Sequence, residues 1–174
     1  MNESVLYTLA EVAVTLAGFS GLVVVFRLRG AEAWTPTELR IFWLLLGDSF
    51  LVVIFALFPI PLALANWSPD ALWGLCNALL GSCFIIVDLL VLQGERRDRA
   101  AKQLVTVPFI TPLLYVMSVV AFGMGLALWL SVWDLVVQRG QAVYVLGLIF
   151  MIAFAAMEFL FFIGLMARRR DEPS

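Results

Sequence analysis

Five apolar stretches constrain the fold of this chain more than any other feature. They cover residues 5–26, 41–64, 71–92, 107–130 and 142–166. Each has the roughly 20 residues that an α-helix needs to cross a bilayer. Hydrophobic residues make up 63% of the chain and charged residues only 14%, whereas a soluble domain is about half apolar and about a quarter charged. The sequence predicts an all-α integral membrane protein, a bundle of about five transmembrane helices forming a single domain (1–170) with a flexible tail (171–174).

Basic residues fall almost entirely on one side of this bundle. Ten of the eleven Lys and Arg residues lie beside the helix ends on that side: Arg27, Arg29, Arg40, Arg96, Arg97, Arg99, Lys102, Arg168, Arg169 and Arg170. Arg139 alone falls on the other side. Because basic loops stay in the cytoplasm, we expect an external N-terminus and a cytoplasmic C-terminus. The basic residues from Arg96 to Lys102 and from Arg168 to Arg170 also attract anionic lipid and are candidates for docking a cytosolic partner.

Proline and hydroxyl residues mark several helix ends. Pro59 and Pro61 are expected to end or kink the second helix, because proline removes a backbone donor. Thr35, followed by Pro36, is expected to cap the start of the second helix. Ser68, followed by Pro69, is expected to do the same for the third.

Four carboxylic acids lie within the apolar stretches: Glu11, Asp48, Asp88 and Glu158. Carboxylates in hydrocarbon are costly and usually face a bundle interior, a partner or a water path. Helical rise places Asp48 and Asp88 about 12 Å, and Glu158 about 15 Å, from the nearest basic residue of their own helix, so all three reach the inner half of the membrane. Glu11 lies in the outer part. The acids predict either an ion or proton path, or polar pairs that hold helices together.

The first apolar stretch carries two patterned faces. Polar and small residues recur at spacings of four, three, four and three: Ser4, Thr8, Glu11, Thr15 and Gly18. Small residues recur at four-residue spacing: Ala13, Ala17 and Gly21. The first set shares one helix face and predicts a water path lined by Thr8, Glu11 and Thr15. The second permits close approach of another helix, and ordinary bundle packing is the alternative for both.

The sequence offers no basis for an enzyme. The chain has no histidine, the commonest metal ligand and general base. It has no phosphate-binding loop, nucleophile elbow, metal-ligand cluster or haem motif. Cys76 and Cys83 are seven residues apart on one predicted helix, about 10 Å, which is too far for a disulfide. We therefore expect no catalytic residue, cofactor, metal or direct nucleic-acid site.

Residues 11–26, EVAVTLAGFSGLVVVF, followed by Arg27, resemble the opening of a family of small bacterial multi-pass membrane proteins. Residues 34–40, WTPTELR, resemble the family's continuation. The resemblance extends to the membrane effector of the Hailong type of anti-phage defence. It implies a homo-oligomeric, channel-like protein of the bacterial inner membrane, a tetramer, restrained by a cytosolic regulatory partner such as a nucleotidyltransferase. The family offers no catalytic residue to carry over.

Three functions are compatible with these features. The leading hypothesis is a homo-oligomeric ion-channel-like protein, in which symmetric association arranges copies of each acid as a ring. Such a protein would depolarise or permeabilise the inner membrane in anti-phage defence. The second is a small proton- or cation-coupled transporter with Asp48 and Glu158 as relay groups. The third is a non-conducting scaffold or sensor that docks a cytosolic partner on its basic inner face.

Overall fold

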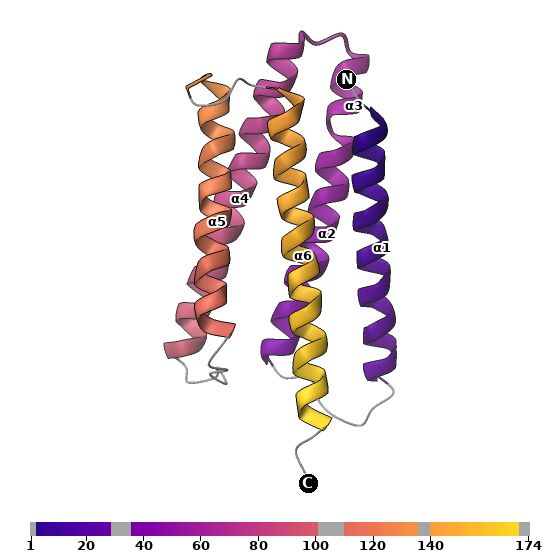
Figure 1. Ribbon diagram of the computed structural model, residues 1–174, viewed down its shortest axis with the longest axis vertical. Helices are drawn as coiled ribbons and strands as arrows, with labels where there is room; N and C mark the ends of the chain where they lie inside the picture. The colour runs from indigo at the N-terminus through magenta and orange to yellow at the C-terminus, as the bar shows by residue number, and fades with distance from the viewer. Residues whose placement is uncertain (1–2, 29–35, 101–109, 136–139, 171–174) are drawn as a thin grey trace. The chain divides into compact units, whose positions relative to one another are not determined.

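The computed structural model describes residues 3–28, 36–100, 110–135 and 140–170 (Figure 1). Within these ranges the regular structure is α-helical: α1 (Glu3–Leu28), α2 (Pro36–Leu57), α3 (Pro59–Leu64), α4 (Pro69–Ala100), α5 (Ile110–Val132) and α6 (Gln141–Arg170). Five segments are long and apolar enough to cross a membrane: Glu3–Leu22, Glu38–Leu64, Pro69–Arg97, Tyr115–Val132 and Gln141–Gly164. The prediction of an all-α helical membrane protein with five spans is confirmed.

The second span contains a break between two helices. Residue Phe58 separates α2 from α3, which begins at Pro59. Proline cannot donate the backbone hydrogen bond that would continue the preceding helix, so the predicted end or kink is confirmed. The short helix α3 ends in a turn at Asn66, whose φ of 56° is left-handed. Asparagine tolerates that conformation better than most residues.

The start of α4 matches its sequence signal, but its end does not. The Ser68 hydroxyl accepts a hydrogen bond from the Ala71 backbone N–H at 3.4 Å, and Pro69 is the first helical residue, as predicted. The helix continues for 32 residues to Ala100, beyond the apolar stretch that ends at residue 92. Glutamate, arginine and alanine favour helix, so the basic segment extends α4 past the membrane instead of forming a loop. The predicted cap of α2 at Thr35 lies outside the described residues.

The chain divides into two compact units, residues 57–147 and residues 2–56 with 148–174. In the first unit α4 and α5 run side by side (Figure 1). Two glycines meet in their contact: a Cβ added to Gly81 would lie 2.9 Å from the Gly125 carbonyl oxygen. A Cβ added to Gly147, at the start of α6, would lie 2.9 Å from Leu80 Cδ2. Gly81 and Gly125 allow the backbones of α4 and α5 to approach closely, and Gly147 leaves room for the Leu80 side chain.

The second unit has one buried stripe on each of its helices. Their spacings of three and four residues put each stripe on one helix face. The buried residues are Leu6, Ala10 and Ala13 on α1, Leu45, Ser49, Val52 and Ala56 on α2, and Leu148, Met151, Ala155 and Phe162 on α6.

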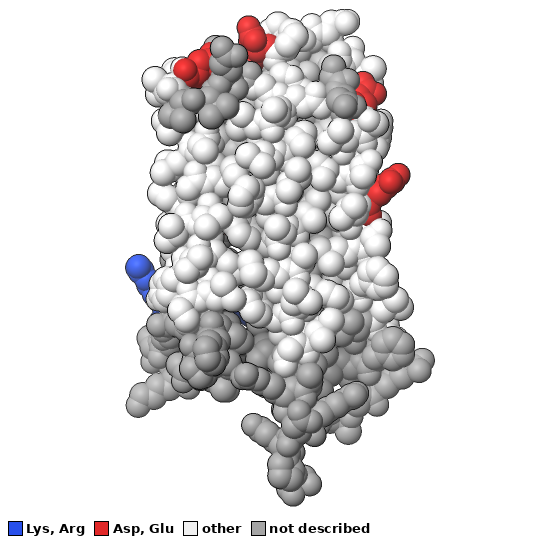
Figure 2. Space-filling model, viewed as in Figure 1, with Lys and Arg blue, Asp and Glu red and all other residues white. Residues whose placement is uncertain are grey.

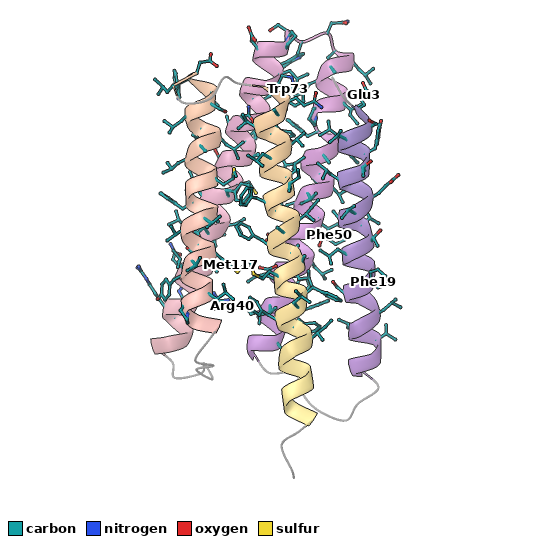
Figure 3. The ribbon with its side chains drawn as sticks, viewed as in Figure 1. Glu3, Phe19, Arg40, Phe50, Trp73 and Met117 are labelled. Atoms are coloured by element: carbon teal, nitrogen blue, oxygen red, sulfur yellow. The ribbon has the colours of Figure 1, made fainter. Side chains whose placement is uncertain are left out.

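Large apolar side chains are exposed on all five long helices, including Phe19, Phe50, Ile86, Val119 and Leu160. Figure 3 labels Phe19 on α1 and Phe50 on α2, which are 55% and 57% exposed. Among the described residues, uncharged side chains predominate on the face shown in Figure 2. An apolar surface of this extent is expected to face lipid.

Candidate functional site

The polar stripe of α1 faces away from the core of its own chain. All five of its residues are exposed: Ser4, Thr8, Glu11, Thr15 and Gly18. The opposite face of the helix holds Leu6, Ala10 and Ala13, which are buried. A membrane helix normally turns its polar side chains inward and its apolar side chains to lipid. The outward polar stripe of α1 is therefore a feature that a single copy of the chain leaves unexplained.

Within this stripe, Glu11 differs from the hydroxyl residues. The Thr8 hydroxyl donates a hydrogen bond to the Ser4 carbonyl at 2.9 Å, and the Thr15 hydroxyl donates one to the Glu11 carbonyl at 2.8 Å. These bonds satisfy both hydroxyls inside the helix. No side chain in the described part of the chain pairs with the Glu11 carboxylate. Since Glu11 lies eight residues after Glu3, it is about 12 Å along the axis from the start of its span.

The small-residue stripe of α1 is divided between core and surface. Ala13 is buried by its own chain, with 1% of its surface exposed, and Ala17 is half-buried. A Cβ added to Gly21 meets no described heavy atom within 4 Å. Only the Gly21 end of this stripe is therefore open to a helix from another chain, and Ala13 already contributes to intramolecular packing.

Two of the four predicted acids come together in the second unit. Asp48 on α2 is 9% exposed, and its carboxylate is close enough to that of Glu158 on α6 for the two to interact electrostatically. Glu158 continues the buried stripe of α6, three residues after Ala155 and four before Phe162. Its Oε2 atom is inaccessible to solvent and has no hydrogen-bond partner among the described residues.

Asp88, the third acid, belongs to the first unit and has a different partner. The Ser118 hydroxyl of α5 donates a hydrogen bond to the Asp88 carboxylate of α4. Farther along the same pair of helices, the Trp129 indole N–H donates to the Ser82 hydroxyl at 3.2 Å. Both bonds join α4 to α5: the Ser82 bond lies beside the contact between Gly81 and Gly125, and Asp88 lies seven residues after Gly81 on α4. Asp88 thus holds two helices together, the packing role that was one of its two predicted roles.

The predicted basic docking surface is described only in part. Arg96 and Arg97 are exposed near the end of α4. The backbones of Arg99 and of Arg168, Arg169 and Arg170 lie in α4 and α6, but their side chains are outside the described residues, as is all of Lys102. Arg96 and Arg97 are the part of this surface that the structure supports as accessible.

Several buried polar residues escape sequence reasoning. Asn77 on α4 is completely buried, and neither atom of its amide has a hydrogen-bond partner among the described residues. It lies one turn after Trp73, labelled in Figure 3, whose ring is 5.7 Å from that of Tyr144. Glu38 and Glu95 are also buried. Their sequence signal is weak because Asn77 is uncharged and both glutamates lie near the ends of apolar stretches.

The described residues contain no group of three or more Asp, Glu, Cys and His side chains that could hold a metal ion, and Cys76 and Cys83 are free thiols. Comparisons with models of protein families, with curated proteins and with solved structures find no match. The fold defines the class, a multi-pass helical membrane protein. The features of this fold that bear on function are the outward stripe of α1 and the acids on α2, α4 and α6.

Proposed function

We propose that this protein is a homo-oligomeric, ion-channel-like membrane protein in which α1 lines the ion path. The observation that carries the proposal is Glu11, an exposed carboxylate at membrane depth that no described side chain of its own chain pairs with. An acidic residue at the centre of a membrane helix costs about 2.5–3.5 kcal/mol on insertion scales, and Glu11, in the outer part of its span, has a smaller cost of the same kind. Contact with water removes most of that cost.

Symmetric association would create a water-filled path beside α1. When copies pack around an axis with their α1 helices inward, Glu11 becomes a ring of carboxylates, the arrangement that selects cations. Thr8 and Thr15 lie one turn to either side and present polar surface to the same path. Gly21, which has open space beside it, allows an α1 helix of another copy to approach closely. We favour a tetramer, the state that the family resemblance implies.

The same resemblance implies a biological role. An oligomer that opens a cation path in the bacterial inner membrane would depolarise it, as an effector of anti-phage defence does. Arg96 and Arg97, exposed near the end of α4, offer a cytoplasmic surface for a regulatory partner such as a nucleotidyltransferase. A nucleotidyltransferase gene beside the native gene would support this role if co-expression of the nucleotidyltransferase suppresses the toxicity of the membrane protein. Toxicity that is indifferent to such a neighbour would contradict it.

Conductance tests the channel directly. We expect the purified protein to produce cation-selective currents in planar bilayers, and Glu11→Gln to reduce the selectivity while leaving the oligomer intact. The matched control is Glu3→Gln, which removes an exposed carboxylate from the first turn of the same helix. Equal currents and selectivity in wild type and Glu11→Gln would exclude α1 as the lining. An intact oligomer without current would favour a non-conducting scaffold or sensor.

The proximity of Asp48 and Glu158 supports a second candidate function, proton- or cation-coupled transport. A transporter with relay groups on α2 and α6 would move its substrate in proportion to an ion gradient without unitary current steps. Flux measurements in proteoliposomes therefore separate the two candidates. A gradient-dependent flux that is lost in Asp48→Asn and retained in Glu11→Gln would favour the transporter.

A further inference from the structure

The pair formed by Asp48 and Glu158 lies in an antiparallel seam between α2 and α6. A second contact fixes the direction of the two helices: the rings of Phe42 and Phe162 are 6.0 Å apart. From the ring pair to the acid pair, residue numbers rise by six along α2 and fall by four along α6. Both acids are therefore positioned by the packing of apolar stripes, and the ring pair lies toward the end where α2 begins and α6 finishes.

Apolar residues surround the two acids along the seam. Leu45 and Val52 flank Asp48 on α2 and are fully buried. Ala155 and Phe162 flank Glu158 on α6 and are also buried. Ser49, the buried polar neighbour of Asp48, donates its hydroxyl to the Leu45 carbonyl at 2.8 Å, and Glu158 Oε2 is left buried without a hydrogen bond among the described residues.

The basic residues of α2 and α6 lie at least eight residues from these acids along their own helices. The sequence has no Lys or Arg in residues 41–56 of α2 or 148–167 of α6. Arg40 is eight residues from Asp48, about 12 Å along the helix, and Arg168 is ten residues from Glu158, about 15 Å. The described ionisable side chains of α1, namely Glu3, Tyr7 and Glu11, are all exposed. Glu38, the remaining described acid of α2, lies ten residues before Asp48.

Two carboxylates that interact electrostatically, with no Lys or Arg nearer than eight residues on α2 or α6, cannot both stay ionised at low cost in hydrocarbon. Taking one ion out of water costs several kcal/mol even after the protein relaxes, and like charges at close range add to that cost. A single proton between the two groups removes one charge and turns repulsion into a hydrogen bond. It also gives the buried oxygen of Glu158 a partner.

We propose that Asp48 and Glu158 form a proton-exchange site in which the two carboxyl groups share one proton. In the occupied state one carboxylic acid donates its O–H to the other carboxylate. Release breaks that O–H bond, transfers the proton to water and leaves two carboxylates; uptake is the reverse, and neither step needs an oxidant or reductant. The site is built from α2 and α6, so it stands whether or not α1 lines an ion path.

The ring pair of Phe42 and Phe162 controls access to this site from one end of the seam. Phe162 is fully buried and lies one turn beyond Glu158, and Phe42 is half-buried opposite it. Apolar rings exclude the water that would carry the proton. Exchange toward that end therefore requires the rings to separate. Phe42→Ala, which removes the less buried ring, should speed exchange without the large loss of stability that truncating Phe162 would cause.

Infrared spectroscopy of the protein in lipid tests the site. A protonated carboxyl has a C=O stretching band that carboxylates lack and that shifts in D2O. We expect this band at neutral pH in wild type, its loss in Asp48→Asn/Glu158→Gln, and its retention in the control Asp70→Asn, which changes an exposed acid at the start of α4. A band that persists in the double variant, or that disappears in Asp88→Asn alone, would overturn the proposal.

Two further measurements keep the test decisive if the double variant fails to fold. In an Asp88→Asn background, the pH is raised from acid, and the band should persist to neutral pH. Its disappearance already in the acidic range where exposed carboxyl groups ionise would refute the site. The shift in D2O should be faster in Phe42→Ala than in this background alone, and an unchanged rate would exclude the ring pair as a barrier. Removal of the band by sodium ions at constant pH would show a cation site in place of a proton site.

Discussion

Replacing Gly125 with alanine should separate α4 from α5. A Cβ at this position would lie 2.9 Å from Ile85 Cγ1 and 3.0 Å from the Gly81 carbonyl oxygen. The Ile85 side chain can rotate away, but the carbonyl belongs to the backbone of α4, so the helices must move apart. Overpacking of this kind costs about 1–3 kcal/mol. Alanine also favours helix over glycine by about 0.5–1 kcal/mol, which offsets part of that cost.

Gly123→Ala is the matched control for this change. It lies two residues away on α5, and its added Cβ meets no described heavy atom within 4 Å. Because the gain in helix propensity is the same in both variants, it cancels in the comparison. Gly125→Ala should therefore be less stable than Gly123→Ala by about 1–3 kcal/mol, roughly 5- to 150-fold in the unfolding equilibrium.

Reversible unfolding in mixed detergent micelles measures this difference. Tryptophan fluorescence follows unfolding, and one of the six tryptophans, Trp129, lies at the contact, with Cδ1 3.0 Å from a Cβ added to Gly81. Equal stability of Gly125→Ala and Gly123→Ala would show that α4 and α5 do not meet at their glycines. That result would refute the packing described for the first unit.

Two other predictions concern the interhelical bonds and the topology. Ser118→Ala should destabilise the protein by about 0.6–1.7 kcal/mol, because Asp88 loses its partner on α5. The control Ser131→Ala removes a bond to Leu128 of the same helix and should cost less. Equal losses of stability in thermal unfolding would contradict this prediction. Reporter fusions after Asn66 and Asp134 should be extracytoplasmic and those after Arg97 and Arg170 cytoplasmic, because ten of eleven basic residues flank the expected inner side. Finding both termini on one side would exclude five full crossings.

The fold was predictable where it depends on local composition. Hydropathy over about 20 residues identifies a span whatever that span packs against, so all five were found. The break at Pro59 and the cap at Ser68 follow from properties of single residues. The extension of α4 to Ala100 was missed because hydropathy marks the edge of the membrane and does not mark the end of a helix.

The membrane depth of the candidate acids was predictable from the sequence, but the helix that each acid faces was not. Counting helical rise placed Asp48, Asp88 and Glu158 at a similar level, yet only Asp48 and Glu158 meet within one unit, while Asp88 bonds to Ser118. Pairing depends on how each helix rotates about its axis and which neighbour it meets. Tertiary packing sets both, and the sequence pattern of one helix does not. Asn77 was missed for the same reason.

Cysteine accessibility tests most directly whether the outward stripe of α1 faces water. Single cysteines would replace Thr8, Glu11 or Thr15, and separately Val12 or Val14, in a background lacking Cys76 and Cys83. All five positions are exposed in one chain, so only the surrounding medium distinguishes them. A water-soluble thiol reagent should label positions 8, 11 and 15 faster than 12 and 14. Equal rates at all five positions would contradict the account.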